Sequence, residues 1–208
     1  MSVMGGFFGA FALMSAAERF GSAMTGNLLD MMIHLAGRNT AELLSRFGAL
    51  LVYIAGLILA DLLQRHTKIC MKKACLAADT AGLLLSMVLM RIDAALHPLL
   101  EIYPVFFVTA FQWGGYGEAR GFSSSSLFST NNLKQCITAF TEFAVTKDPA
   151  MRVKGCFYLV TLLAFLLGGF LGAVCVYRFA EYGALAGLLP LLTAALLLRL
   201  KEKAAPAA

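Results

Sequence analysis

Two short polar motifs interrupt an otherwise apolar chain and carry residue types suited to binding a solute. Met24-Thr25-Gly26-Asn27-Leu28 resembles Ser129-Thr130-Asn131-Asn132-Leu133, and each motif follows an apolar segment. A threonine at the start of a helix can cap backbone N–H groups that have no partner within the helix. The remaining N–H groups and the helix dipole favour an anion or a carbonyl oxygen. We therefore predict a site for a small polar or anionic solute, formed by Ser22, Thr25, Asn27, Gln112, Ser129, Thr130, Asn131 and Asn132.

A structural role for the same motifs stays open. Helix capping and hydrogen bonds between helices would use the same side chains, and such bonds contribute about 0.6 kcal/mol each inside a membrane. The binding interpretation is favoured where non-helical backbone lies at membrane depth, because such backbone is tolerated mainly around a cavity. Gln112 lies in the middle of an apolar segment, where it could contact either a solute or another helix.

A second set of residues could carry protons or ions. Asp79 lies about five residues inside an apolar segment, where an aspartate costs up to about 2.5–3.5 kcal/mol, so it should face the interior of a helix bundle or extend toward the lysine-rich loop of residues 65–73. Asp30 and His34 are four residues apart and share one helix face, either as a proton-carrying pair or as a structural one. Glu18 and Glu118 occupy matching places after two apolar segments.

The neighbours of these glutamates offer a simpler role. Arg19 follows Glu18, and Arg120 lies two residues after Glu118, so each carboxylate could form an ion pair at the membrane interface.

No group of residues has the spacing of a metal centre or a catalytic site. Five cysteines at irregular spacing form no disulfide framework, and none pairs with His34, His66 or His97 at ligand spacing. A hydrolase would need a pair such as Ser129 and His34, and nothing in the spacing supports that pair. We expect no metal, no cofactor and no enzymatic activity.

The elements that position these residues are apolar helices. Of 208 residues, 60% are hydrophobic and 14% are charged, against about 25% charged in soluble domains. A helix needs about 20 apolar residues to cross a bilayer. The first segment lacks the basic start and cleavage site of a signal peptide, so we expect a retained helix. The predicted spans are residues 1–17, 47–64, 74–90, 102–117, 155–177 and 182–198.

The basic residues predict the orientation of these spans, because cytoplasmic loops are enriched in lysine and arginine. Six spans place twelve of the basic residues on one side, in residues 65–73, 118–154 and 199–203. The other side has only Arg19, Arg38, Arg46, Arg91 and Arg178. Both termini are then cytoplasmic, and the net charge of +5 reflects this bias rather than a nucleic-acid partner.

Residues 20–37 and 121–145 are less apolar and lie outside the six spans. If both crossed the membrane, Lys147, Arg152 and Lys154 would move to the side opposite Lys68, Lys72 and Lys73, which would break the charge rule. We therefore expect two re-entrant or broken half-helices, one after the first span and one after the fourth.

The matching motifs indicate an internal duplication. Each half, residues 1–95 and residues 96–208, has the order span, half-helix, span, span within a single membrane domain. Three spans per half make the repeat inverted, as in many transporters. Gly5-x-x-x-Gly9 and Gly168-x-x-x-Gly172 are small-residue faces that pack helices within a subunit or in a homo-oligomer. The expected fold class is an all-α integral membrane protein.

The chain resembles the YoaK-like family of small bacterial multi-pass membrane proteins. The resemblance rests on Gly5-Gly6-Phe7, Phe20 and Thr25-Gly26-Asn27 in the first half, and on Gln112-Trp113 and the string from Phe128 to Leu133 in the second. Many members carry an acidic residue where this chain has Gly9, and an asparagine where it has Ser22. The resemblance implies a bacterial cytoplasmic membrane and supplies no substrate.

Three functional classes follow from these observations. The duplication and the paired motifs favour a transporter or channel for a small polar or anionic solute. A membrane scaffold or accessory subunit is the alternative, although such a chain offers a partner little beyond its lipid-facing helices. A membrane-embedded enzyme is the third class. The expected partners are the lipid bilayer, the solute and a second copy of the chain.

Overall fold

The computed structural model describes residues 1–15, 24–92, 98–119, 121–123, 127 and 129–204, which are almost entirely helical. A short antiparallel hairpin of two-residue strands, β1 (Glu118–Ala119) and β2 (Phe122–Ser123), departs from the all-α expectation. Gly121 within it has φ +78°, which glycine adopts without strain. The helices are α1 (Ser2–Ser15), α2 (Met24–Ala36), α3 (Thr40–His66), α4 (Met71–Ile92), α5 (Pro98–Glu101), α6 (Tyr103–Gly115), α7 (Ser129–Thr146), α8 (Pro149–Phe179) and α9 (Leu188–Ala204).

Three helical stretches of the described chain are long and apolar enough to cross a membrane. They are α3, α4 and the continuous run Pro149–Ala204, which joins α8 to α9. The 27 residues of α3 extend about 40 Å at 1.5 Å per residue, more than the hydrocarbon thickness of a bilayer. These helices indicate a membrane protein. The expected first and fourth spans are shorter in the structure, since α1 has 14 residues and α6 has 13.

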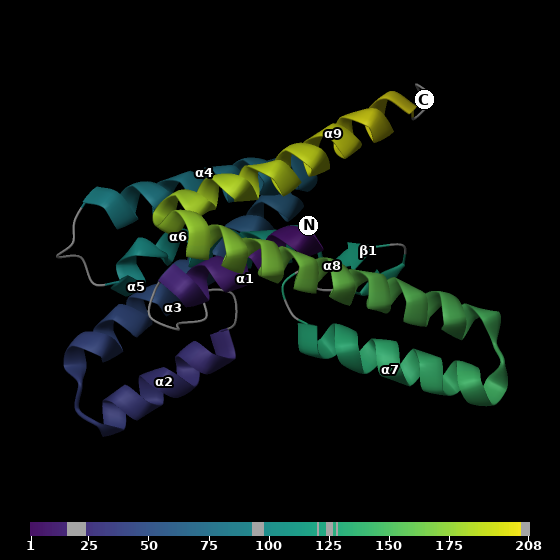
Figure 1. Cartoon of the computed structure of the whole chain (residues 1–208), viewed down its shortest axis with the longest axis horizontal. Coiled ribbons are helices and arrows are strands. Elements are labelled where there is room, and N and C mark those ends of the chain that lie inside the picture. The colour runs from purple at the N-terminus through teal and green to yellow at the C-terminus, as the bar shows by residue number, and fades with distance from the viewer. Residues whose placement is uncertain (16–23, 93–97, 120, 124–126, 128, 205–208) are drawn as a thin grey trace.

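The run Pro149–Ala204 reverses direction at the 3₁₀ helix η1 (Ala180–Gly187), so α8 and α9 extend in opposite directions (Figure 1). Ala180 adopts φ +49° at the end of α8. A Cβ atom on Gly183 would lie 2.7 Å from the carbonyl oxygen of Cys175, so this tight reversal needs glycine there. The long apolar stretch is therefore a helical hairpin.

Two helix pairs pack at glycine contacts in the centre of the molecule. In one pair, α1 packs against α8, and a Cβ atom on Gly168 would collide with the carbonyl oxygen of Val3. In the other, α6 packs against α3, and a Cβ atom on Gly56 would lie 2.5 Å from the carbonyl oxygen of Phe107. The small-residue face Gly168-x-x-x-Gly172 thus packs within the chain, one of its two expected uses.

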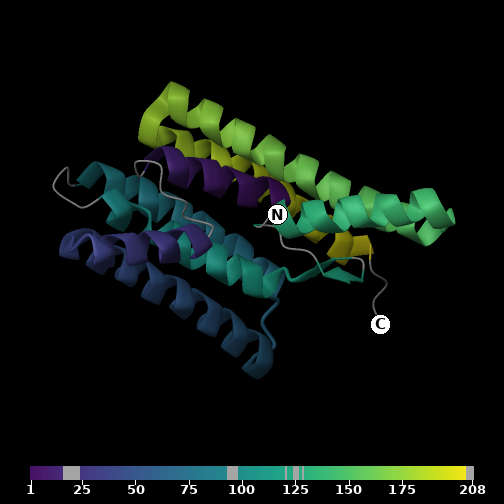
Figure 2. The same cartoon turned by 90° about the horizontal axis from the view of Figure 1, so that it is seen from below.

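Two peripheral helices fold back on the long helices that follow them. Figures 1 and 2 show α2 against α3 and α7 against α8, as two hairpins that extend toward opposite ends of the molecule. Each hairpin turns at a basic residue with positive φ, Arg38 at +54° and Lys147 at +57°. The next residue caps the long helix: Asn39 accepts from the Glu42 N–H at 3.3 Å and Asp148 from the Ala150 N–H at 2.9 Å.

The tightly packed interior lies where α1, α4 and α6 meet, between the two hairpins. Phe7 and Phe11 of α1 stack with ring centroids 6.4 Å apart, and Leu83 of α4 is fully buried near them. A large group of outward-facing apolar side chains on α3, α4 and α8 surrounds this interior, as expected where lipid replaces water.

Candidate functional site

The predicted site residues fall in three places in the structure. Thr25, Asn27, Asp30 and His34 lie on α2, and Ser129 to Asn132 form the first turn of α7. Asp79 of α4 and Gln112 of α6 lie in the central interior. Ser22 and Glu18 are outside the described residues, and Glu118 is described only as backbone in β1.

One asparagine from each motif is buried, while the residues around it are exposed. Asn27 is 3% exposed and Asn132 is 2% exposed. Thr25, Thr130 and Asn131 are exposed on the outer faces of their helices. The helical repeat of 3.6 residues explains the difference, because only one residue in this short turn can face the partner helix.

The sequence predicted that Thr25 and Thr130 cap their helices, but in the structure they do not occupy the capping position. Met24 is the first residue of α2 and Ser129 is the first residue of α7, so Thr25 and Thr130 are each the second helical residue. A capping side chain must belong to the residue before the first helical position. This expectation is wrong for the observed helix bounds, which begin one residue earlier than the motifs suggested.

The contact between α2 and α3 contains a buried arginine, Arg46, which the sequence predicts to lie in a loop just before the span 47–64. Arg46 of α3 is 5% exposed, and its Nη1 donates to Asp30 Oδ2 at 2.9 Å and to Asn27 Oδ1 at 3.5 Å. Its Nε lies 3.7 Å from Glu42 Oε2. Two carboxylates and an amide thus surround one guanidinium, which links two of the predicted site residues.

This cluster changes the interpretation of Asp30. The described partner of its carboxylate is Arg46, and not His34 as the four-residue spacing had suggested. A signal for Arg46 was present in the sequence, because Glu42 and Arg46 are also four apart and lie within an apolar stretch. The pairing with Asp30 joins positions 16 residues apart across a turn, and only the folded hairpin brings them together.

The contact between α7 and α8 is formed without an ion pair among its described residues. Cys136 of α7 donates from Sγ to the carbonyl oxygen of Gly155 at 3.6 Å. Tyr158 of α8 is buried and donates its hydroxyl to the carbonyl oxygen of Ser123 at 2.7 Å. The two hairpins therefore share an arrangement but differ in electrostatics, because among the described residues only the first has an ion pair between its two helices.

The central interior holds a buried carboxylate. Asp79 is fully buried on α4, which confirms that it does not face lipid, and neither of its oxygens accepts a hydrogen bond from a described residue. Ser86 lies two helical turns further along and is also fully buried. Gln112 and Thr109 of the neighbouring α6 are fully buried as well. A buried carboxylate without a hydrogen bond is costly unless water, a proton or a cation accompanies it.

The beginnings of α2 and α7 lie toward the middle of the molecule. In Figure 1 and Figure 2 the two N-terminal ends face each other, and the helices run from there in opposite directions. The two helices do not form a packed pair of their own, since α2 packs on α3 and α7 packs on α8. The first backbone N–H groups of both helices, which an α-helix cannot satisfy internally, are thus directed toward one central region.

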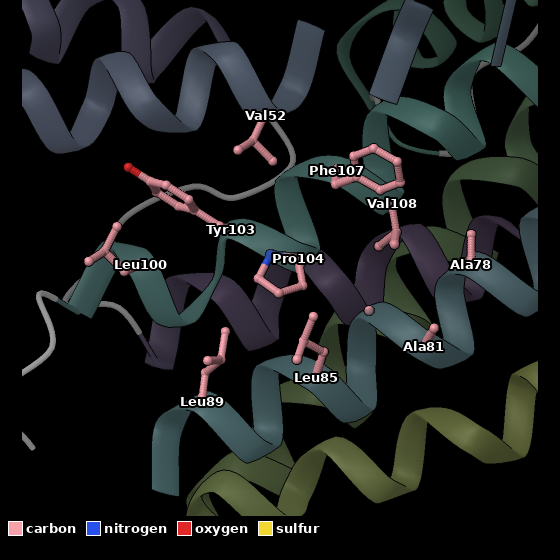
Figure 3. Close-up of a pocket in the computed structure, with 11 residues that line it drawn as sticks. Val52, Ala78, Ala81, Leu85, Leu89, Leu100, Tyr103, Pro104, Phe107 and Val108 are labelled. Atoms are coloured by element: carbon pink, nitrogen blue, oxygen red, sulfur yellow. The ribbon is translucent and has the colours of Figure 1, made fainter. Parts of the chain in front are cut away.

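A separate pocket of about 550 Å³ opens between α3, α4 and α6. Its walls are apolar side chains and Pro104, and the hydroxyl of Tyr103 points away from the other labelled side chains (Figure 3). That hydroxyl donates to the carbonyl oxygen of Ser45 at 2.5 Å. The pocket is thus distinct from the predicted polar site, because it offers no group that would bind a polar solute.

Comparison with known proteins identifies a family for this chain but gives no activity. No curated protein and no solved structure matches the chain. A family described as "Protein of unknown function (DUF1275)" matches residues 1–198, which is nearly the whole sequence. The chain belongs to the DUF1275 family.

Proposed function

We propose that this protein is a membrane transporter or channel for a small polar or anionic solute, with Asn27 and Asn132 beside its path. The observation that carries the proposal is the matched pair of hairpins. Each contains one buried asparagine in the first turn of a helix, and the two helices begin near the middle of the molecule and run apart. Transporters commonly bind solutes where two such discontinuous helices begin.

We also propose an inverted duplication of the chain, for which the two halves offer matching features. Arg38-Asn39 and Lys147-Asp148 form equivalent turns, each with a positive φ followed by a side-chain cap. In this duplication α1 corresponds to α6, and α3 corresponds to α8. The two central helix pairs are then equivalent, because α1 packs on α8 and α6 packs on α3. The resemblance to the YoaK-like family, which is consistent with membership of DUF1275, extends over both halves.

The chemistry near the path favours an anion or a neutral polar molecule. Helix N-termini offer N–H donors and a positive dipole end. Arg46 lies next to Asn27, but the Asp30 and Glu42 carboxylates balance its charge, so the helix N-termini and not this arginine favour an anion. Asparagine provides a donor and an acceptor without a net charge. A divalent cation would instead need several oxygen ligands close together.

We propose Asp79 as the residue that couples transport to a proton or a small cation. It is fully buried in α4, and neither carboxylate oxygen has a hydrogen bond from a described residue. Carboxylates inside membrane helices are costly and usually serve such a purpose. Asp30 is less suited to this role, because Arg46 already pairs with it.

We also propose a bacterial cytoplasmic membrane as the location, with six spans and both termini in the cytoplasm. The twelve basic residues on one predicted side support this orientation. Lys73 at the beginning of α4 pairs with Glu202 near the end of α9 at 2.9 Å, so two of these basic regions lie together.

The test is solute flux in proteoliposomes with a matched set of asparagine variants. Radiolabelled chloride, sulfate, phosphate, formate and glycerol form the first panel. We expect Asn27→Leu and Asn132→Leu to abolish the flux seen with the wild-type protein. Asn131→Leu, at the exposed neighbouring position, should retain it. If all three variants carry wild-type flux, the buried asparagines do not line the path. If folded wild-type protein moves none of these solutes, the protein is not a transporter of this class.

A further inference from the structure

A basic recess lies between the beginning of α4 and the end of α9, away from the proposed solute path. Its volume is about 400 Å³, and a second recess of about 310 Å³ adjoins it across Glu202 and Leu198. Three segments distant in sequence form the first recess, namely the start of α4, the end of α6 and the end of α9. Its walls are Cys70, Met71, Lys72, Gly115, Leu198, Lys201 and Glu202.

The charge of this region is strongly positive. Lys72 and Lys201 line the first recess, and Lys73 and Arg199 line the second. The single acidic residue of both linings, Glu202, is paired with Lys73 at 2.9 Å. Lys72, Arg199 and Lys201 are exposed, and no ion pair is recorded for them among the described residues. The recess therefore has positive charge in excess over its own carboxylate.

The interior of the recess combines an apolar wall with backbone donors. Met71 and Leu198 provide apolar surface between the lysines. Met71 is the first residue of the 22-residue helix α4. The N–H groups of Lys73 and Ala74 donate to the carbonyl oxygen of Cys70, so the donors that the helix itself leaves over are the N–H groups of Met71 and Lys72. Tyr116 fixes this end of α4 to α6, because its hydroxyl donates to the carbonyl oxygen of Lys72 at 3.3 Å.

We propose that this recess binds the phosphate headgroup of an anionic phospholipid. A phosphodiester would contact Lys72 and Lys201 and lie at the positive end of α4, while its acyl chains follow the apolar surfaces of α4 and α9. A free phosphate ion would share the headgroup contacts but would leave Met71 and Leu198 without a role. The recess lies at the ends of two apolar helices, so its mouth would lie at headgroup depth in a bilayer.

A general attraction between the membrane surface and basic residues is the simpler explanation. Such attraction depends on total charge and not on position. The site proposal instead requires that Lys72 and Lys201 matter more than other basic residues. Lys134 and Arg152, on α7 and α8, are exposed and provide the comparison, because their removal changes the net charge by the same amount.

Native mass spectrometry of the detergent-solubilised protein tests the proposal. Phosphatidylglycerol is titrated against the wild type, Lys72→Gln/Lys201→Gln and Lys134→Gln/Arg152→Gln. We expect the first double variant to bind about 25-fold more weakly, or about fivefold for each lysine, and the second to bind like the wild type. The single variant Lys201→Gln, at an exposed position near the end of α9, serves if the double variant does not fold.

Titrations with two further ligands, phosphatidylcholine and glycerol-3-phosphate, identify which part of the lipid is bound. Phosphatidylcholine can have the same chains and has the same phosphodiester, but its choline cation leaves no net charge and is repelled by the lysines, so it should bind much more weakly than phosphatidylglycerol. Glycerol-3-phosphate has the phosphate without the chains and should also bind weakly. Equal binding of phosphatidylcholine, equal binding of glycerol-3-phosphate, or equal loss in the two double variants would each overturn the lipid site.

Discussion

Replacing Arg46 by methionine removes the guanidinium that links α3 to Asn27 and Asp30 of α2. The methionine keeps much of the apolar length of the side chain and loses the guanidinium. Arg46 is 5% exposed, and its Nη1 lies 2.9 Å from Asp30 Oδ2. The variant would leave the Asp30 and Glu42 carboxylates facing an apolar contact. We expect the first hairpin to be destabilised.

The expected magnitude follows from the exposure of each partner. Removing one member of a fully buried ion pair costs about 3–5 kcal/mol. The side chain of Asp30 is 44% exposed, so water can recover part of this loss, whereas Glu42 at 17% exposure recovers less. We therefore expect Arg46→Met to cost about 2–3 kcal/mol, which lowers the unfolding temperature by about 5–10 °C in a chain of this size.

Thermal unfolding in detergent measures this effect, with the reactivity of the buried thiols of Cys75 and Cys136 as the signal for unfolding. Arg65→Met is the matched control, because Arg65 lies even closer to its carboxylate, 2.7 Å from Asp61, but the side chains are 70% and 56% exposed. We expect the control to cost less than about 0.5 kcal/mol. The double variant Arg46→Met/Asp30→Asn should recover about 1–2 kcal/mol of the loss. Equal effects at Arg46 and Arg65, or no recovery in the double variant, would refute the assignment.

Three further predictions concern packing, charge and topology. Gly168→Ala should cost about 1–3 kcal/mol in thermal stability because its Cβ atom would collide with Val3, whereas Gly169→Ala, whose Cβ atom would lie 3.7 Å from the nearest atom, should be neutral or slightly stabilising. Asp79→Asn should unfold at the wild-type temperature or above it, because it removes a buried charge, and a large loss of stability would instead identify Asp79 as a structural ion-pair partner. In a background without other cysteines, a membrane-impermeant thiol reagent applied to intact cells should label Asn39→Cys and not Cys70. The reverse pattern would contradict the proposed orientation.

The sequence alone predicted the helical membrane class and the places of most helices. Long stretches without charge, such as residues 155–177, permit little else, because backbone N–H and C=O groups in lipid must be satisfied within a helix. The helical repeat and the matching motifs also placed α2 and α7 to within a residue or two. Asp79 was expected to face inward, since a lipid-facing carboxylate is too costly, and it does.

The tertiary structure decided which polar residues are buried and what they touch. Asn131 and Asn132 are neighbours in one motif, yet only Asn132 is buried, because the direction of a side chain depends on how its helix rotates against α8. Arg46 was counted as a loop charge, since its partner Asp30 comes within reach only after the chain turns at Arg38. Local sequence determines helix formation through local hydrogen bonds, whereas the rotation and pairing of helices depend on contacts between residues far apart in the chain.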